Sequence, residues 1–170
     1  MRFEKVSLAQ WREDAAKVYY KKKFADLDSE TAAVIDTIYE GIKLPARATR
    51  GSAGYDFFAP DDVSVGSTPV DILTGIRWIV EEGDPDMVLL CMPRSGLGFK
   101  YGTSLVNTVG VIDQDYYKAD NEGHIRFRMT SVNPCYIEAG KAFGQGIQTP
   151  FVANDEVAAE RHGGFGSTGN

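Results

Sequence analysis

Residues that could take part in chemistry gather in short polar segments that follow apolar runs. In the segment NTVGVIDQDYY at positions 107–117, Asn107 precedes Asp113 and Tyr116. A carboxylate can act as a general base, and the amide of Asn107 offers both a hydrogen-bond donor and an acceptor. Because Asp is also common in turns that end strands, these residues alone leave a structural interpretation open.

Two further segments carry groups that suit phosphate oxygens. PRSG at positions 93–96 combines the planar fork of Arg94 with the hydroxyl of Ser95 and the unhindered backbone N–H of Gly96. GFGSTG, near the end of the chain, lacks the lysine of a P-loop. PRSG is also an ordinary turn sequence, so phosphate binding and a surface turn are both open at this point.

The composition indicates one folded domain with a small appendage. The chain has 170 residues, of which 43% are hydrophobic, and a net charge of −6. This charge argues against binding of a nucleic-acid backbone but does not exclude a small polyphosphate. The N-terminus lacks the apolar region of a signal peptide, and no run approaches the ~18 apolar residues of a membrane span. We therefore expect a cytoplasmic protein that binds neither nucleic acid nor membrane.

The two cysteines, Cys91 and Cys135, stand far apart in apolar surroundings. A disulfide, a metal pair and a catalytic thiol are open alternatives. Buried thiols without a chemical role are favoured, because free cysteine is among the most buried residue types.

The elements that must position these residues change character along the chain. The first 43 residues read as helical, with a capping pattern at Ser7 and Gln10 and a second helix that is expected to begin near Asp28 or Ser29. From position 44 onward, short β-type runs alternate with Gly, Pro, Asn and Asp. Such spacing favours an all-β sandwich or barrel over a parallel α/β sheet.

Five segments in the β region and the tail resemble the five motifs of the trimeric dUTPase family. Each segment alone is weak evidence for this family, whereas five segments in the same order are specific for it. They are GSAGYDFF at 51–58, PRSGLGFKYG at 93–102, NTVGVIDQDYY at 107–117, GKAFGQGI at 140–147 and RHGGFGSTG at 161–169.

The resemblance implies a fold, an activity and an assembly. The fold would be a jelly-roll-like barrel over residues 44–154, followed by a glycine-rich tail at 155–170 that closes the active site; the helical extension at 1–43 lies outside the shared motifs. The substrate would be dUTP, hydrolysed to dUMP and pyrophosphate by a homotrimer whose sites combine motifs from three subunits. Mg²⁺ would be bound through the substrate triphosphate, with no direct protein ligand.

The third motif is implied to hold the nucleoside and the attacking water. Asp113 matches the carboxylate that deprotonates this water, and Asn107 matches the residue that pairs with uracil, assisted by backbone groups around Gly110 and Val111. Tyr116 matches the tyrosine that packs against the deoxyribose and leaves no room for a 2′-hydroxyl.

The remaining motifs are implied to bind phosphate. Arg94, Ser95 and Gly96 match the second motif, where Ser95 would stabilise the leaving group, and Gln145 matches the glutamine of the fourth. Asp56 in the first motif either anchors the water shell of the metal or braces a turn. The matching residues of the fifth motif are Arg161, Phe165, Gly166, Ser167 and Thr168.

The chain departs from the family pattern at several places. Lys141 to Gly144 replace the middle of the fourth motif, His162 marks a shortened approach to GGF, and YKADNEGHI lengthens the turn after Tyr116. Two other functions stay open. A dCTP deaminase shares the fold and the trimer, and a regulator on this scaffold would use the extension and the long turn to bind a protein partner.

Overall fold

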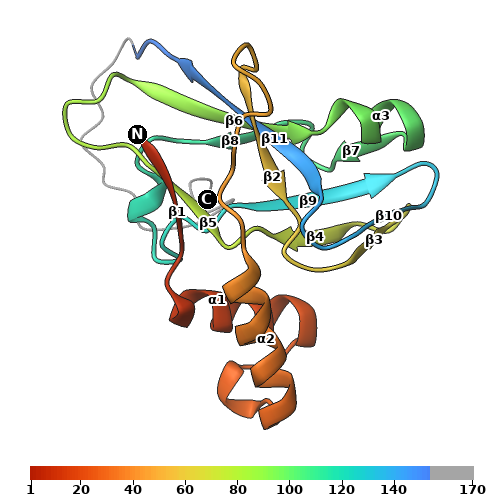
Figure 1. Ribbon diagram of the computed structural model, residues 1–170. Helices are drawn as coiled ribbons and strands as arrows, with labels where there is room; N and C mark the ends of the chain where they lie inside the picture. The colour runs from red at the N-terminus through yellow and green to blue at the C-terminus, as the bar shows by residue number, and fades with distance from the viewer. Residues whose placement is uncertain (154–170) are drawn as a thin grey trace.

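The computed structural model describes residues 1–153 and shows two packed layers of antiparallel strands with a helical extension beneath them (Figure 1). One layer is the sheet β2-β11-β6-β8, and the facing layer is the sheet β4-β9-β7. Two further strand pairs, β1-β5 and β10-β3, complete the body. The expected all-β, jelly-roll-like barrel with an N-terminal helical extension is confirmed.

Most strands are short, as the closely spaced turn residues predicted, and β6 and β11 are the longest. The strands are β1 (Arg2–Lys5), β2 (Gly54–Phe58), β3 (Val63–Val65), β4 (Val70–Leu73), β5 (Ile76–Ile79), β6 (Met87–Pro93), β7 (Thr103–Leu105), β8 (Gly110–Ile112), β9 (Arg126–Ser131), β10 (Cys135–Ile137) and β11 (Ala142–Pro150). The helices are α1 (Leu8–Ala15), η1 (Ala16–Tyr20), η2 (Phe24–Asp26), α2 (Ser29–Gly41), α3 (Ser95–Tyr101) and η3 (Tyr116–Lys118).

β11 organises the larger sheet because it pairs with β2 along one side and with β6 along the other. Gln145 lies opposite Asp56 of β2 and Met92 of β6. The register shifts between Ala142 and Gly144, which marks a bulge near the start of the strand. Three strands therefore bring residues from three separate sequence segments to one end of this sheet.

Aromatic side chains fill the space between the two sheets. Phe127 of β9 packs against Phe57 of β2 at 5.3 Å and against Phe143 of β11 at 5.0 Å between ring centroids. All three rings are fully or almost fully buried. Burying a side chain of this size stabilises the fold by roughly 1.5–3 kcal/mol, so this cluster fixes the two sheets against each other.

The helices of the extension begin at the capping residues that the sequence indicated. The hydroxyl of Ser7 accepts a hydrogen bond from the backbone N–H of Gln10 at 3.1 Å, and the carboxylate of Asp28 accepts one from that of Thr31 at 2.8 Å. Each cap satisfies an N–H group that the first turn of a helix leaves without a backbone partner.

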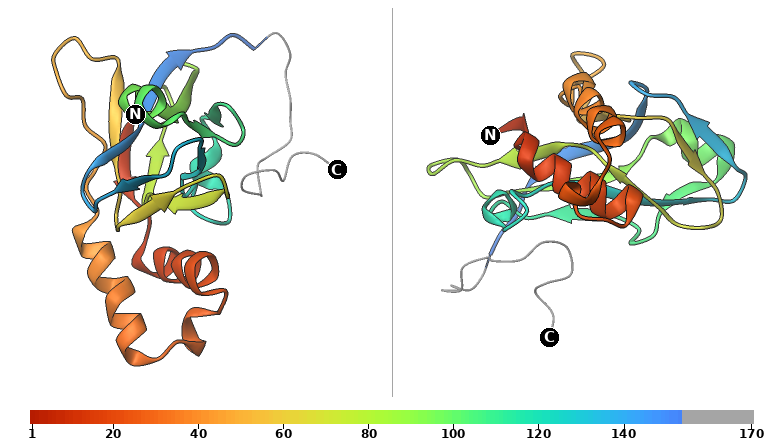
Figure 2. Two further views of the ribbon diagram at one scale, coloured as in Figure 1. Left: turned by 90° about the vertical axis from the view of Figure 1, so that its right-hand side faces the viewer. Right: turned by 90° about the horizontal axis from the view of Figure 1, so that it is seen from below.

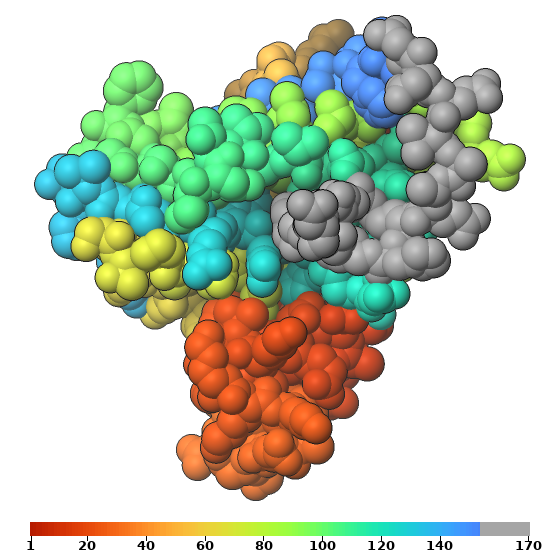
Figure 3. Space-filling model, turned by 180° about the vertical axis from the view of Figure 1, so that it is seen from behind, coloured from red at the N-terminus to blue at the C-terminus, as the bar shows by residue number. Residues whose placement is uncertain are grey.

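The extension protrudes from the barrel (Figures 2 and 3), and hydrogen bonds hold it together and tie it to the strands. Trp11 is fully buried, and its indole N–H donates to the carbonyl of Ile35 at 2.9 Å, which joins α1 to α2. The hydroxyl of Tyr19 accepts from the backbone N–H of Leu73 at 3.2 Å. Among residues 1–153, no helix has the length and the apolar composition needed to cross a membrane.

The first residues of the chain differ from the expected helical extension. Arg2–Lys5 form strand β1, which pairs antiparallel with β5, and the ring of Phe3 packs 5.7 Å from that of Phe57. Four residues are too few for a helix of their own, and pairing with a distant strand satisfies their backbone groups. The extension therefore starts as part of the barrel and becomes helical only at Leu8.

Candidate active site

Residues of the first, second and fourth motifs meet at one end of the larger sheet. The guanidinium of Arg94 lies 3.5 Å from the carboxylate of Asp56, whose side chain is 18% exposed. The amide of Gln145 donates to the carbonyl of Pro93 at 3.4 Å, and Gln145 is the direct neighbour of Asp56 across the strands. About half of the Arg94 side chain is exposed, so its guanidinium can contact an anion while it stays beside the carboxylate of Asp56.

The second motif turns from β6 into α3. Arg94 has extended backbone angles, and its carbonyl accepts the N–H groups of Leu97 and Gly98 at 3.0 and 3.2 Å, which begins the helix. Ser95 and Gly96 are exposed on this first turn. The segment is therefore a turn, and its polar groups face outward beside Arg94.

A bend before β8 presents the amide of Asn107. Thr108 adopts a left-handed conformation with φ of 66°, and the N–H of Val109 donates to the carbonyl of Asn107 at 2.7 Å. Beside this bend lies a pocket of about 170 Å³ lined by Val106, Asn107, Arg126 and Arg128. The exposed amide thus opens onto a small concave site.

β8 runs from this bend to Asp113, the candidate general base. Gly110 is buried opposite Cys91, and a β-carbon at this glycine would lie 3.2 Å from that of Cys91, so a larger residue would push the strands apart. Val111 is 53% exposed on the outer face. Asp113 is exposed just beyond the end of the strand, where its carbonyl accepts the N–H of Tyr116 at 3.1 Å.

Tyr116 is enclosed within this chain. Its side chain is 3% exposed, and its hydroxyl donates to the carbonyl of His124 at 3.3 Å and accepts from the amide of Asn121 at 3.2 Å. The lengthened turn after the third motif therefore folds back over the tyrosine. The tyrosine that was expected to contact a sugar is held in place by this turn.

Asp113 and Arg94 lie at opposite ends of the larger sheet, whereas Asn107 precedes β8 on the side nearer Arg94. Ile112 lies opposite Leu89 on β6, and Arg94 stands five positions beyond Leu89, which at about 3.3 Å per residue is about 16 Å. Asp113 lies one residue further from Arg94. Reacting groups must approach to about 3–3.5 Å, so one chain does not bring Asp113 to Arg94.

Several expected site residues lie outside the described residues. These are the residues of the fifth motif, namely Arg161, Phe165, Gly166, Ser167 and Thr168.

Two arginines on β9 were missed by the reasoning from sequence. Arg126 and Arg128 are exposed and line the pocket beside Asn107. The signal was present in HIRFRM, where arginines alternate with apolar residues, since a strand with this alternation turns both arginines to one face. Arg128 also lies 3.8 Å from the carboxylate of Asp71 on the paired strand β4.

The cysteines take no part in this arrangement. Both are free thiols and both are buried, and burial raises the pKa of Cys91. A buried thiol with a raised pKa is inert, which agrees with the favoured interpretation. Within residues 1–153, no group of three or more His, Cys, Asp or Glu side chains is placed to hold a metal ion.

Comparison with known proteins agrees with the motifs. The family model described as dUTPase matches residues 40–169. The deoxyuridine 5'-triphosphate nucleotidohydrolase of Lactococcus lactis is 40% identical over 137 residues, which cover 76% of this chain and 89% of that protein. The protein of the same name from Idiomarina loihiensis is 37% identical over 153 residues, with 82% and 96% covered.

Solved structures share the fold. The dUTPase from Streptococcus mutans matches with a TM-score of 0.63 and 29% sequence identity, over 92% of this chain and 100% of that one. A mutant dUTPase from phage phi11 of S. aureus, in which a structural Mg(II) ion is coordinated, matches with a TM-score of 0.56 and 19% identity over 72% and 92%. Because the family model spans more than half of the sequence and relatives at about 40% identity cover three quarters of it, the chain belongs to the dUTPase family.

Proposed function

We propose that this protein hydrolyses dUTP to dUMP and pyrophosphate. The observation that carries the proposal is the arrangement around β8, which places the amide of Asn107 on a small pocket at one end and the exposed carboxylate of Asp113 at the other. The relatives named deoxyuridine 5'-triphosphate nucleotidohydrolase support the identity of the base and the sugar.

In the proposed reaction, water attacks the α-phosphorus and the bond from this phosphorus to the bridging oxygen of the β-phosphate breaks. Asp113 accepts the proton of the water, which makes the oxygen a better nucleophile. Arg94 and Ser95 donate hydrogen bonds to the phosphate oxygens, so the negative charge that develops on the departing pyrophosphate is stabilised. Gly96 and Gln145 complete these contacts beside Asp56.

Uracil would be recognised by the amide of Asn107 and by backbone groups near Gly110 and Val111. Tyr116 would lie along the deoxyribose and exclude a 2′-hydroxyl. The hydrogen bonds of its hydroxyl with Asn121 and His124 support this role, because a ring that cannot swing aside discriminates between two sugars better than a mobile one.

We also propose a homotrimer with shared active sites. The wide separation of Asp113 from Arg94 along β6 supports this assembly, since a neighbouring subunit could supply the phosphate-binding residues that one chain holds too far from Asp113. The tail residues Arg161, Phe165, Gly166, Ser167 and Thr168 would close over the triphosphate.

The proposed cofactor is Mg²⁺, carried by the triphosphate. Mg²⁺ keeps several waters and binds phosphate oxygens readily, and when bound it neutralises charge on the leaving group. The donor set at the phosphate end fits this arrangement, because Asp56 is a single carboxylate whose oxygens can accept hydrogen bonds from metal-bound waters. Its contact with Arg94 leaves its second oxygen for that role.

Product analysis on four nucleotides tests the proposal. The purified protein with Mg²⁺ is incubated with dUTP, dCTP, dTTP or UTP, and pyrophosphate, ammonia and nucleotides are measured. We expect pyrophosphate and dUMP from dUTP alone, and a loss of at least about 100-fold in kcat for Asp113→Asn. The matched control is Asp26→Asn, which changes an exposed carboxylate of η2.

The same experiment separates the alternatives. Ammonia from dCTP would establish a deaminase instead. If dUTP yields no pyrophosphate and Asp113→Asn behaves like the parent, the enzyme proposal fails, and a protein that acts by binding a partner becomes the better explanation.

A further inference from the structure

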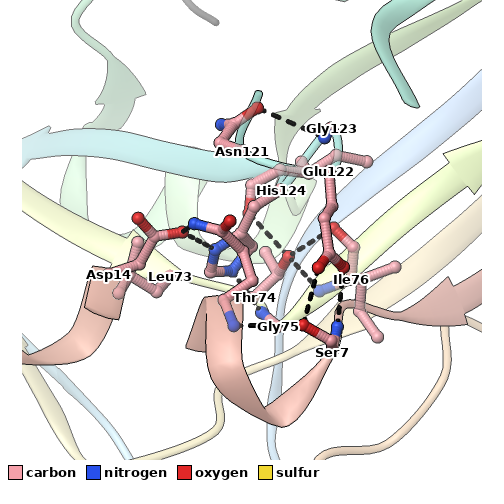
Figure 4. A network of polar contacts seen from close by, with 12 residues as sticks. Ser7, Asp14, Leu73, Thr74, Gly75, Ile76, Asn121, Glu122, Gly123 and His124 are labelled. Atoms are coloured by element: carbon pink, nitrogen blue, oxygen red, sulfur yellow. Dashed lines mark hydrogen bonds and ion pairs between the residues drawn. The ribbon is translucent and has the colours of Figure 1, made fainter. Parts of the chain in front are cut away.

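The helical extension holds the turn that encloses Tyr116, which we call the 119–124 loop. The imidazole Nδ1 of His124 lies 2.6 Å from the carboxylate of Asp14 on α1 (Figure 4). The carboxylate of Glu122 accepts hydrogen bonds from the backbone N–H of Ser7 at 2.8 Å and from its hydroxyl at 2.6 Å. Two side chains of one short loop are thus bound by two residues of the extension.

The ring of His124 is fixed on both of its nitrogens. Nε2 accepts a hydrogen bond from the backbone N–H of Gly75 at 2.8 Å, and the ring is 2% exposed. Because Nε2 is an acceptor, the ring proton of the neutral imidazole lies on Nδ1, which donates it to Asp14. Gly75 has φ of 68°, and a β-carbon there would come within 2.2 Å of Ile42, so its N–H is held in place by tight packing.

Asp14 is suited to accept this hydrogen bond. Burial raises the pKa of its carboxyl, but the interactions with His124, the hydrogen bond from Gln10 and the charge of Lys17 together outweigh burial, so the pKa lies below its usual value. The side chain of Gln10 donates to the same carboxylate oxygen at 2.9 Å. Near neutral pH Asp14 is therefore an anion that accepts from both neighbours.

The 119–124 loop, held by these contacts, is in turn hydrogen-bonded to Tyr116. Asn121 donates to the tyrosine hydroxyl, which in turn donates to the carbonyl of His124. Gly123 has φ of 71°, and a β-carbon there would lie 2.6 Å from the α-carbon of Tyr117. The loop is packed so closely that a displacement of His124 moves the groups that hold the hydroxyl.

We propose that Asp14 and His124 are positioning residues for Tyr116 in the active site. The extension, acting through the 119–124 loop, fixes the ring of Tyr116 and so sharpens the preference for a 2′-deoxyribose over a ribose. The inference rests on the proposed dUTP hydrolysis, and it gives the extension a function in that reaction.

The test compares specificity constants for dUTP and UTP in four proteins. Asp14→Ala removes the acceptor, Asp14→Asn keeps an oxygen that can accept from Nδ1, and Arg12→Ala is the matched control. Arg12 lies on the same helix and binds Asp36 of α2 at 2.6 Å, so its loss loosens the extension without touching the loop.

The proposal predicts that stability and substrate specificity will respond differently in the two alanine variants. Asp14→Ala and Arg12→Ala should both lower Tm, but Asp14→Ala alone should lower the ratio of kcat/KM for dUTP to that for UTP. The expected fall is about tenfold, equivalent to about 1.4 kcal/mol, and Asp14→Asn should recover most of it. A rise in KM for dUTP should accompany the change, with a smaller effect on kcat.

Three outcomes would overturn the proposal. One is an unchanged ratio in folded Asp14→Ala, and another is an equal loss of the ratio in Arg12→Ala. The third applies if Asp14→Ala does not fold: Asn121→Ala removes the donor to Tyr116 from the loop, and an unchanged ratio in this variant would contradict the proposal. A parent protein that releases no pyrophosphate from dUTP contradicts the proposed function as well, whereas an active parent with unaltered variants contradicts only this inference.

Discussion

Gly144 lies where any side chain would collide with the ring of Phe127. A β-carbon at this position would lie 2.5 Å from Cε1 and 2.9 Å from Cζ of that ring. Carbon atoms in contact prefer about 3.5–4.0 Å, so the ring would have to retreat by about 1 Å. It has little space to do so, because Phe127 is 1% exposed and packs against Phe57 and Phe143.

Overpacking of this kind costs typically about 1–3 kcal/mol. For Gly144→Ala we therefore expect a loss of about 2 kcal/mol in the free energy of unfolding, after a small gain from the reduced freedom of the unfolded chain. In a protein of this size, that corresponds to a fall in Tm of about 4–8 °C. Urea unfolding and Tm should be measured at one protein concentration, since association shifts both.

Two further variants show whether the ring is the cause. Gly41→Ala is the matched control, since a β-carbon at the end of α2 has no atom within 4 Å, and it should leave stability unchanged or slightly higher. Phe127→Leu on the Gly144→Ala background should recover part of the loss. If Gly144→Ala is as stable as the parent, or if the double variant is weaker than the two single losses added together, the steric argument is wrong.

Two other properties follow from the charges and thiols. Hydrogen bonds from Arg2 and Arg77 to Glu4, and from Arg12 to Asp36, lower the pKa of both carboxyls in the folded state. These contacts therefore stabilise the folded protein at pH values above the pKa of the unfolded chain, and this stabilisation is lost as the pH falls through the pKa of the folded protein. Tm measured by circular dichroism should hold steady to about pH 5 and fall below about pH 4, and a constant Tm down to pH 3 would contradict this. Cys91 and Cys135 should react with a thiol reagent only slowly in the native protein and rapidly in urea, and rapid native reaction would show that they are accessible.

The sequence could name candidate site residues but not their surroundings. Asn107, Asp113 and Arg94 stand in short motifs that can be read without knowing the rest of the fold, and their roles stay predictions. The partners of Tyr116 could not, since the hydrogen bonds from Asn121 and to His124 depend on how a lengthened turn closes. Asp56 was left with two interpretations, and its contact with Arg94 appears only once β2 and β6 flank the same strand.

Local pattern also failed at the N-terminus. Helical spacing, caps and apolar periodicity correctly indicated α1 and α2, because these signals lie within a few residues of one another. β1 spans only Arg2–Lys5 and exists because β5 lies beside it. A strand this short has no periodicity to detect, and its partner stands more than 70 positions away along the chain.

The contact between Asp14 and His124 joins residues that are 110 positions apart. During synthesis at about 5–20 residues per second, α1 leaves the ribosome roughly 5 to 20 s before the loop that it will bind. Although the extension is made first, it cannot complete its contacts until this loop has been made. A nascent chain paused before His124 would leave the carboxylate of Asp14 without its partner on the loop.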